Sequence, residues 1–185
     1  MVSLTLRDKG NTARALDIAV DEAVRRNAPI LVASSGGDTA VAAMRAAMEN
    51  GIADRLYIIS SVYGSRGPGS NGMKEECRRE LDEANIRIIT AAHVLSGAER
   101  ALSTKFHGIY PSEIIAHTLR MFSQGVKVAV EIAAMALDAG AIPFGTPVIA
   151  VGGTGRGADT VAVLTPAYTQ DIFATRVHEI LCMPL

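Results

Sequence analysis

The sequence predicts an α/β fold, a three-layer α/β/α sandwich built on a mostly parallel β-sheet. Short, nearly continuous apolar runs at 29–33, 55–60 and 86–90 alternate with stretches of helical periodicity, which is typical of a parallel sheet covered by helices on both faces. Hydrophobic residues make up 49% of the 185-residue chain, which is enough for a full core and excludes disorder. A chain of this length suits one domain, so we expect residues 1–185 to fold as a single unit.

The first half of the chain has the pattern of a βαβαβ unit preceded by a helix. An apolar stripe at helical spacing predicts that first helix over about 11–27, and Asn27 is suited to close it in a left-handed turn. Two further helices, from Asp38 to about Gly51 and over about 72–85, separate the three apolar strands. Right-handed crossovers then bring the loops after the three strands to one edge of the sheet, where ligands bind in such folds.

The second half of the chain has the pattern of helices followed by strands. Helical periodicity predicts three helices, over about 97–106, 111–123 and 126–139. Apolar runs predict three more strands, the first two joined by a glycine-rich loop, at 147–151, 160–164 and 178–183.

Charge and aromatic content exclude two classes of partner. Eighteen Lys and Arg residues against 19 Asp and Glu residues give a net charge of −1, which offers no basic footprint for nucleic acid or an anionic membrane. Aromatic residues make up 4% of the chain and Trp is absent, so stacking platforms for single-stranded nucleic acid are not expected. The most apolar stretch, 126–142, is interrupted by three charged residues and is too short to cross a bilayer. We therefore expect neither a nucleic acid nor a membrane as partner.

Cysteine and histidine usage points to a reducing compartment and no metal site. Cys77 and Cys182 lie far apart in the sequence, which is neither a disulfide framework nor a zinc-binding spacing. The four histidines show no metal-ligand spacing. We expect a cytoplasmic protein without a bound metal.

The first candidate binding loop stands between an expected strand and an expected helix. Its small residues let the backbone approach a ligand closely, and the following helix N-terminus offers unpaired N–H groups and a partial positive charge. Two interpretations remain open, a phosphate site or a plain turn with Asp38 as the helix N-cap. The loop consists of Ser34, Ser35, Gly36, Gly37, Asp38 and Thr39.

The second candidate loop joins two expected strands late in the chain and is rich in glycine. Four glycines within six positions imply unusual φ angles or a close approach of the backbone to a ligand. Arg156 at its tip either clamps an anion with its planar guanidinium or is the exposed tip of a glycine-rich hairpin. The residues of interest are Gly153, Thr154, Gly155, Arg156 and Gly157.

Three further features lie near the same predicted edge of the sheet. The loop 61–72 contains a GxGxxG pattern but is too long after its strand for a dinucleotide fingerprint, so we interpret it as a flexible flap carrying Tyr63. His93 follows the third strand and is either structural or directed into the cleft. Lys127 and Glu131 share one face of an apolar helix, where they form either a buried ion pair or a group that reaches the cleft.

Seven stretches spread over nearly the whole chain resemble one known family, and they are specific together although none would suffice alone. They are Ile30–Thr39, Leu95–Ala101, Gly108–Pro111, Thr118–Phe122, Gly125–Val128, Val151–Thr160 and Glu179–Pro184. On these stretches the chain is similar to the stand-alone archaeal and bacterial proteins related to the C-terminal α/β domain of pyruvate kinase.

This resemblance implies the fold of that C-terminal domain and, as cofactor, FMN, with which the stand-alone proteins are associated. In pyruvate kinase the domain grips a phosphate of a sugar bisphosphate with a loop between a strand and a helix, and Ser34–Thr39 stands in the equivalent place. A second glycine-rich effector loop lies between two late strands, where Gly152–Thr160 stands here. The catalytic (β/α)₈ barrel of pyruvate kinase takes about 250 residues. This chain has no room for a barrel, so we expect no pyruvate kinase activity.

The resemblance and the loops together give a set of expected contacts. The phosphate is expected at the first loop, with the second loop closing over it or over the ribityl chain. The isoalloxazine ring is expected between Tyr63, His93 and Leu95, with Lys127 as a further candidate.

The function expected from the sequence is binding of a phosphorylated small molecule, FMN by resemblance, with the catalytic residues and any reaction left open. The alternatives are a sensor or regulatory module, a flavin-dependent oxidoreductase with His93 or Lys127 near the flavin, and an enzyme acting on a sugar phosphate. Apolar residues of the second half exceed what one small domain buries and predict a homo-oligomer. They include Met121, Phe122, Met135 and Phe144.

Overall fold

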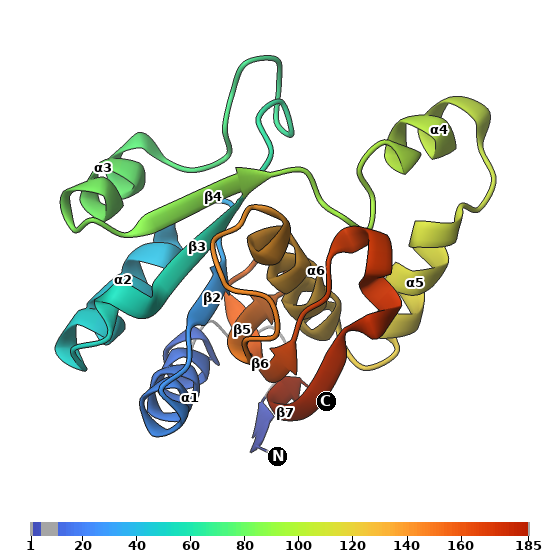
Figure 1. The fold of residues 1–185 in the computed structure, drawn as a ribbon. Helices are drawn as coiled ribbons and strands as arrows, with labels where there is room; N and C mark the ends of the chain where they lie inside the picture. The colour runs from blue at the N-terminus through green and yellow to red at the C-terminus, as the bar shows by residue number, and fades with distance from the viewer. Residues whose placement is uncertain (1, 5–10, 185) are drawn as a thin grey trace.

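The computed structural model describes residues 2–4 and 11–184 and contains one seven-stranded sheet in the order β1-β7-β6-β5-β2-β3-β4 (Figure 1). The pairs β2–β3, β3–β4, β2–β5 and β1–β7 are parallel, whereas β5–β6 and β6–β7 are antiparallel. This confirms the predicted α/β fold with a mostly parallel sheet. The strands are β1 (Val2–Leu4), β2 (Ile30–Ala33), β3 (Leu56–Ser61), β4 (Arg87–Ala91), β5 (Val148–Gly153), β6 (Ala158–Thr165) and β7 (Arg176–Pro184).

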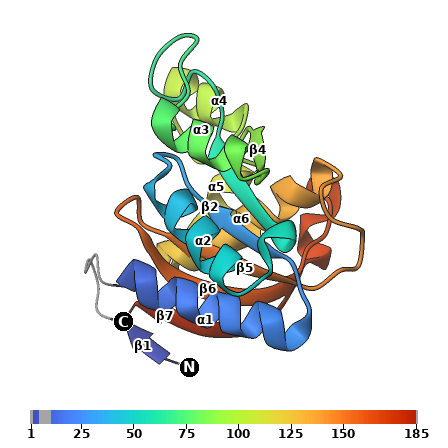
Figure 2. The same cartoon turned by 90° about the vertical axis from the view of Figure 1, so that its left-hand side faces the viewer.

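Helices cover both faces of the sheet and complete the three layers (Figures 1 and 2). One face is covered by α1 (Asn11–Arg26), α2 (Asp38–Glu49) and α3 (Glu75–Glu83). On the other face, α6 (Gln124–Asp138) packs against β5, β6 and β2, and α5 (Pro111–Arg120) packs on α6. Beside α5 and away from the sheet lies α4 (Glu99–Phe106). Two short 3₁₀ helices are η1 (Ala53–Arg55) and η2 (Thr169–Ala174).

Alternate side chains of the central strands supply two separate cores. In β2, Ile30 and Val32 join the core beneath α1 and α2, whereas Leu31 between them joins the core beneath α6. This follows from the two-residue period of a strand, and each such side chain contributes about 1.5–3 kcal/mol when buried. Because both faces are covered, the central strands are apolar at nearly every position, which is why the sequence shows continuous apolar runs.

Some boundaries differ from the sequence prediction. The expected helix over 111–123 ends at Arg120, because Ser123 caps α6 by accepting a hydrogen bond from the Val126 N–H at 3.0 Å. The strand β1, which pairs with β7, was not predicted. Asn27 ends α1 with φ of 53°, which confirms the predicted left-handed turn. Among the described residues, no helix combines the length and the apolar content that crossing a membrane requires.

The sheet order positions the candidate site. The parallel strands β2, β3 and β5 are neighbours, so their carboxyl ends meet at one edge of the sheet. β5 pairs directly with β2, with Val32 opposite Val151. The loop after β2 and the glycine-rich loop between β5 and β6 are therefore adjacent, although more than a hundred residues separate them in the sequence.

Candidate functional site

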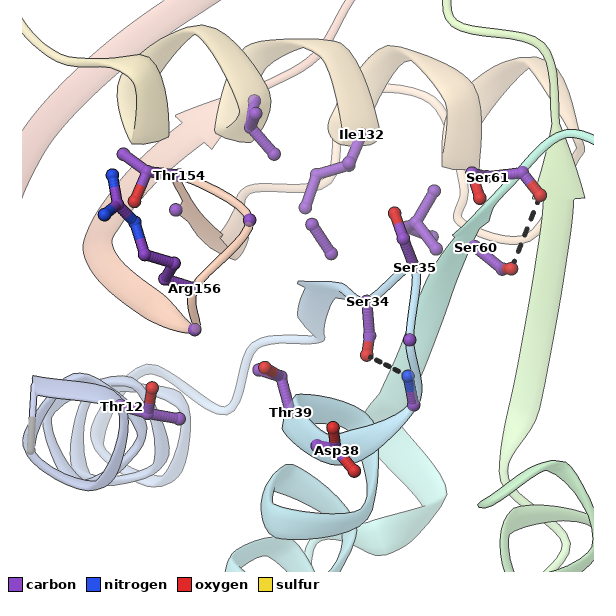
Figure 3. Close-up of a pocket in the computed structure, with 18 of the residues that line it drawn as sticks. Thr12, Ser34, Ser35, Asp38, Thr39, Ser60, Ser61, Ile132, Thr154 and Arg156 are labelled. Carbon is purple, nitrogen blue, oxygen red and sulfur yellow. Dashed lines mark hydrogen bonds between the residues drawn. The ribbon is translucent and has the colours of Figure 1, made fainter. Parts of the chain in front are cut away.

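A cleft of about 910 Å³ opens at the carboxyl ends of β2, β3 and β5 (Figure 3). Its lining comes from the loop after β2, the loop between β5 and β6, one face of α6, and residues that follow β3 and β4. Its volume lies within the range of small-molecule sites, about 300–1,000 Å³. Such a site accommodates a ligand of nucleotide size.

Ser34 fixes the first loop. Its buried Oγ accepts hydrogen bonds from the N–H groups of Gly37 and Ala40, both at 3.2 Å, and so satisfies two donors at the start of α2. Gly37 has φ of 103°, and a Cβ there would overlap the side chain of Cys77, so this position requires glycine. The N-cap is Gly37 rather than Asp38, and the positive end of α2 opens onto the cleft.

The second loop is anchored to the first helix. The Ala158 N–H donates to Thr12 Oγ1 at 3.1 Å, and a Cβ on Gly157, whose φ is 121°, would overlap that same hydroxyl. The loop is thereby held over the start of α1. Figure 3 shows Thr154 and Arg156 across the cleft from Ser34 and Thr39. Arg156 is exposed and makes no ion pair with any residue among 11–184.

The cleft is lined by more positive than negative charge. Arg66, Lys74 and Arg156 supply cations, whereas Asp38 is the one carboxylate among the described lining residues. Lys74 Nζ lies 2.7 Å from Asp38 Oδ1, and this hydrogen bond raises the pKa of Lys74. The Lys74 N–H donates to the Gly36 carbonyl at 3.0 Å, which ties the end of the flap to the first loop. An excess of cations and helix N-terminal donors favours an anionic ligand.

The face of α6 that lines the cleft is largely apolar. Val128, Ile132 and Met135 line it from α6, and Ile59 lines it from β3. Ser60 and Ser61, at the carboxyl end of β3, add hydroxyl groups on the side away from Arg156 (Figure 3). The cleft thus has one end lined by cations and backbone N–H groups, and an apolar wall.

A buried carboxylate lies directly behind the cleft. Glu131 is fully buried, and its Oε1 accepts the backbone N–H of Leu95 at 3.1 Å. Its Oε2 contacts His93 Nδ1 at 3.0 Å and forms an ion pair with Lys127. Burial by itself raises the pKa of Glu131, but the hydrogen bonds from His93 and Lys127 and the charge of Lys127 outweigh burial and hold it below its ordinary value. Glu131 is therefore an ionised carboxylate with three donors.

A second buried acid lies at the base of the second loop. Asp159 accepts a hydrogen bond from Thr160 Oγ1 at 2.7 Å, and Ser123 Oγ lies 3.3 Å from the same Thr160 hydroxyl. No Lys or Arg side chain among the described residues pairs with Asp159. Burial raises the pKa of Asp159, although hydrogen bonds from Thr160 and Thr154 lower it in part.

The structure brings most of the residues expected at the site into one cleft. Tyr63 is 56% exposed and does not line it, because the flap closes on itself through the Gly64 N–H and the Ser70 carbonyl at 2.8 Å. Leu95 and Lys127 are buried beside Glu131 and do not line it either. The expected residues that line the cleft are Ser34, Ser35, Gly36, Gly37, Thr39, His93, Gly153, Thr154, Gly155, Arg156 and Gly157.

Several lining residues were missed by sequence reasoning. Ser60 and Ser61 end a strand next to β2, so the rule that ligands bind at strand ends could have found them. Gln124, Val128, Ile132 and Met135 recur at helical spacing, which is a readable signal once α6 is placed against the sheet. Lys74 gives no such signal, because only the folded flap brings it to Gly36.

A scan against models of known protein families finds no match. Among residues 11–184 no three or more His, Cys, Asp or Glu side chains are grouped so that they could hold a metal ion.

Proposed function

We propose that the cleft binds a phosphorylated small molecule, and that FMN, the cofactor implied by the resemblance, is that molecule. The observation that carries the proposal is the meeting of two glycine-rich loops at the N-terminus of α2, with Arg156 opposite. Backbone N–H groups, hydroxyls and a guanidinium are the donors that a phosphate requires. The one lining carboxylate, Asp38, is already paired with Lys74 and so repels an anion less.

The apolar face of α6 takes the place that Tyr63 and Leu95 were expected to fill. Val128, Ile132 and Met135 line the cleft beyond the loops. A flavin has a phosphate, a polyol chain and a flat apolar ring, and these match the end lined by cations, the hydroxyls of the loops and the α6 wall in turn.

Calorimetry with three ligands tests the proposal. We expect FMN to bind more tightly than riboflavin, because the phosphate supplies the anchoring charge. Equal affinity for riboflavin would contradict the phosphate site. Binding of fructose bisphosphate alone would remove the flavin and favour a sugar-phosphate sensor or enzyme.

A flavin-dependent oxidoreductase is the second candidate function, favoured by the placement of His93 at the cleft. Such an enzyme changes its visible spectrum when a reducing substrate is added to the FMN-loaded protein. A sensor binds its ligand without turnover. Neither role includes transfer of phosphate from phosphoenolpyruvate to ADP.

We also propose that the protein is a homo-oligomer. Met121, Phe122 and Phe144 are 83%, 57% and 71% exposed, whereas Met135 is buried at the cleft. Exposed apolar side chains of this size commonly mark a symmetric interface. A monomer mass by light scattering at micromolar concentration would contradict this proposal.

A further inference from the structure

The loop after β4 and the helix α6 together hold one histidine in a fixed orientation at the cleft. We propose that His93 is the proton-accepting residue of this cleft, that its Nε2 faces the bound molecule, and that Glu131 is the positioning residue behind it. The proposal rests on the proposed function only in assuming that the cleft is where a small molecule binds.

The hydrogen bonds of Glu131 decide which ring nitrogen carries the proton. An ionised carboxylate only accepts hydrogen bonds, so His93 Nδ1, at 3.0 Å from Oε2, must be the N–H donor. A neutral imidazole has one N–H, which leaves a lone pair on Nε2. His93 lines the cleft with its side chain 41% exposed, and Nε2 has no hydrogen-bond partner among residues 11–184. In the neutral form of His93, this lone pair is therefore available to a ligand.

The carboxylate itself is held rigidly. The Leu95 N–H fixes Oε1, and Lys127 binds Oε2 one helical turn before Glu131 on α6. The charged groups around His93 and Glu131 are Lys127 from α6 itself, Arg120 from α5 and Arg100 from α4, together with the Glu131 carboxylate. Glu131 is the one carboxylate among them, so it is the group that stabilises a positive charge on His93.

The arrangement defines the chemical class of group that His93 takes. The ligand must present an O–H or N–H group at the end of the cleft away from Arg156, with its phosphate at the two loops. When the proton moves, the O–H or N–H bond breaks and its electron pair stays on the ligand atom. The proton forms a bond to Nε2, and the imidazolium is balanced by the Glu131 carboxylate. No oxidant or reductant is needed for this step.

Nitrogen NMR of histidine-labelled protein tests the tautomer. In the neutral form of His93, we expect Nδ1 to be protonated and Nε2 to carry the lone pair. The resonance is assigned by its loss in His93→Gln. His117, which is exposed on α5, is the matched control and should show the Nε2–H tautomer of a free histidine.

A double variant tests the role of Glu131. Removing Glu131 alone strands the buried Lys127 cation, so Glu131→Gln is combined with Lys127→Met, which leaves no buried charge. The glutamine carbonyl can still accept the Leu95 N–H while its amide donates to Nδ1. We therefore expect His93 to change to the Nε2–H tautomer. An unchanged tautomer in the double variant would overturn the positioning role, and an Nε2–H tautomer in the wild type would overturn the whole proposal.

Chemical modification separates this proposal from the proposed ligand. Diethyl pyrocarbonate reacts with an accessible unprotonated imidazole nitrogen, so we expect His93 to be modified in the wild type and protected by FMN. Modification without protection would contradict FMN binding in the cleft while supporting the His93 assignment. If the reagent modifies His117 but leaves His93 unmodified, the assignment of His93 as the proton acceptor is overturned, whether or not FMN binds.

Discussion

The two ends of the cleft are built in different ways. At the loop end, the donors are backbone N–H groups, hydroxyls and one exposed guanidinium, all held by glycine-rich loops. At the other end, beyond the edge strand β4, which β2 and β3 separate from β5, one histidine is held by a buried carboxylate on α6. The loop end offers many weak hydrogen-bond donors around the Arg156 guanidinium. The other end offers a single histidine nitrogen in a fixed orientation. Binding strength should therefore come from the loops, and chemistry from His93.

The two ends also differ in what they contribute to stability. The loops lie at the surface, where solvent screens charge, whereas Glu131 and Lys127 are both buried. A change at the buried end should cost stability, and a change at the loop end should cost mainly affinity.

The largest effect is expected from Glu131→Gln as a single substitution. It leaves Lys127 as a buried cation without a counter-charge, which typically costs about 3–5 kcal/mol. Urea denaturation at neutral pH measures this loss. The pKa of Glu131 is lower in the folded state than in the unfolded state. Its ionised form therefore adds to the free energy of unfolding above the pKa of the unfolded state, and this gain is lost as pH falls through the pKa of the folded state. The difference between variant and wild type should therefore shrink in acid.

Lys127→Met is the matched control for that prediction. It leaves Glu131 with two of its donors, the Leu95 N–H and His93, so the loss should be smaller than for Glu131→Gln. A loss as large as that of Glu131→Gln would show that the Leu95 N–H and His93 do not compensate Glu131 for the lost cation.

The second effect is expected from Arg156→Ala, which removes the one guanidinium on the second loop. Charge-assisted hydrogen bonds contribute about 1.5–3 kcal/mol each, so FMN binding should weaken tenfold or more. The free energy of unfolding without ligand should stay nearly unchanged, because Arg156 is exposed. Calorimetry and urea denaturation on the same protein give both numbers. Arg156→Lys, which keeps the charge and loses the planar fork, should recover part of the affinity.

The sequence anticipated much of the fold and the loop end of the cleft. Apolar runs located β2, β3 and β4, and the rule of strand ends then placed the loop Ser34–Thr39 at the edge. The placement of the second loop beside it depends on β5 pairing with β2, which no local pattern reveals. The meeting of the two loops was predicted, and the shared cleft confirms it.

The buried end was beyond the reach of local patterns. The four-residue spacing of Lys127 and Glu131 indicated a pair on one helix face, and the structure confirms a buried ion pair. Its contact with His93 joins residues 38 positions apart and depends on how the loop after β4 crosses α6. Tyr63 illustrates the opposite case, because it is exposed to solvent and does not line the cleft, whereas Arg66 of the same flap does.

The third effect tests the loop end for stability rather than affinity. Ser34→Ala removes the acceptor of the Gly37 and Ala40 N–H groups and should cost about 1 kcal/mol, as loss of a helix cap does. Ser35→Ala is the control, because Ser35 is exposed and its hydroxyl makes no hydrogen bond with residues 11–184. Thermal unfolding without ligand should show a lower midpoint for Ser34→Ala alone. Equal midpoints would mean that water replaces Ser34 at the start of α2.

The smallest effect is expected at Asp159, where the substitution should stabilise the protein and not destabilise it. Burial raises the pKa of this acid in the folded state. The neutral carboxyl therefore adds to stability below the pKa of the unfolded state. This gain is lost as pH rises through the pKa of the folded state, because the buried carboxyl then has to ionise. The start of α6 beside it favours a negative charge, but no cation among the described residues pairs with it. Asp159→Asn is neutral at every pH and keeps an oxygen that can accept from Thr160. It should therefore raise the free energy of unfolding slightly at neutral pH.

Two measurements decide whether burial or the helix N-terminus controls Asp159. Urea denaturation across pH should show the gain of Asp159→Asn at neutral pH and its disappearance in acid, where the wild-type carboxyl is also neutral. Asp82→Asn, an exposed substitution on α3, should change stability little at any pH. A loss of stability in Asp159→Asn at neutral pH would mean that the helix N-terminus outweighs burial. Asp159 would then be an ionised carboxylate at the base of the second loop, and its charge would oppose the anion that Arg156 attracts.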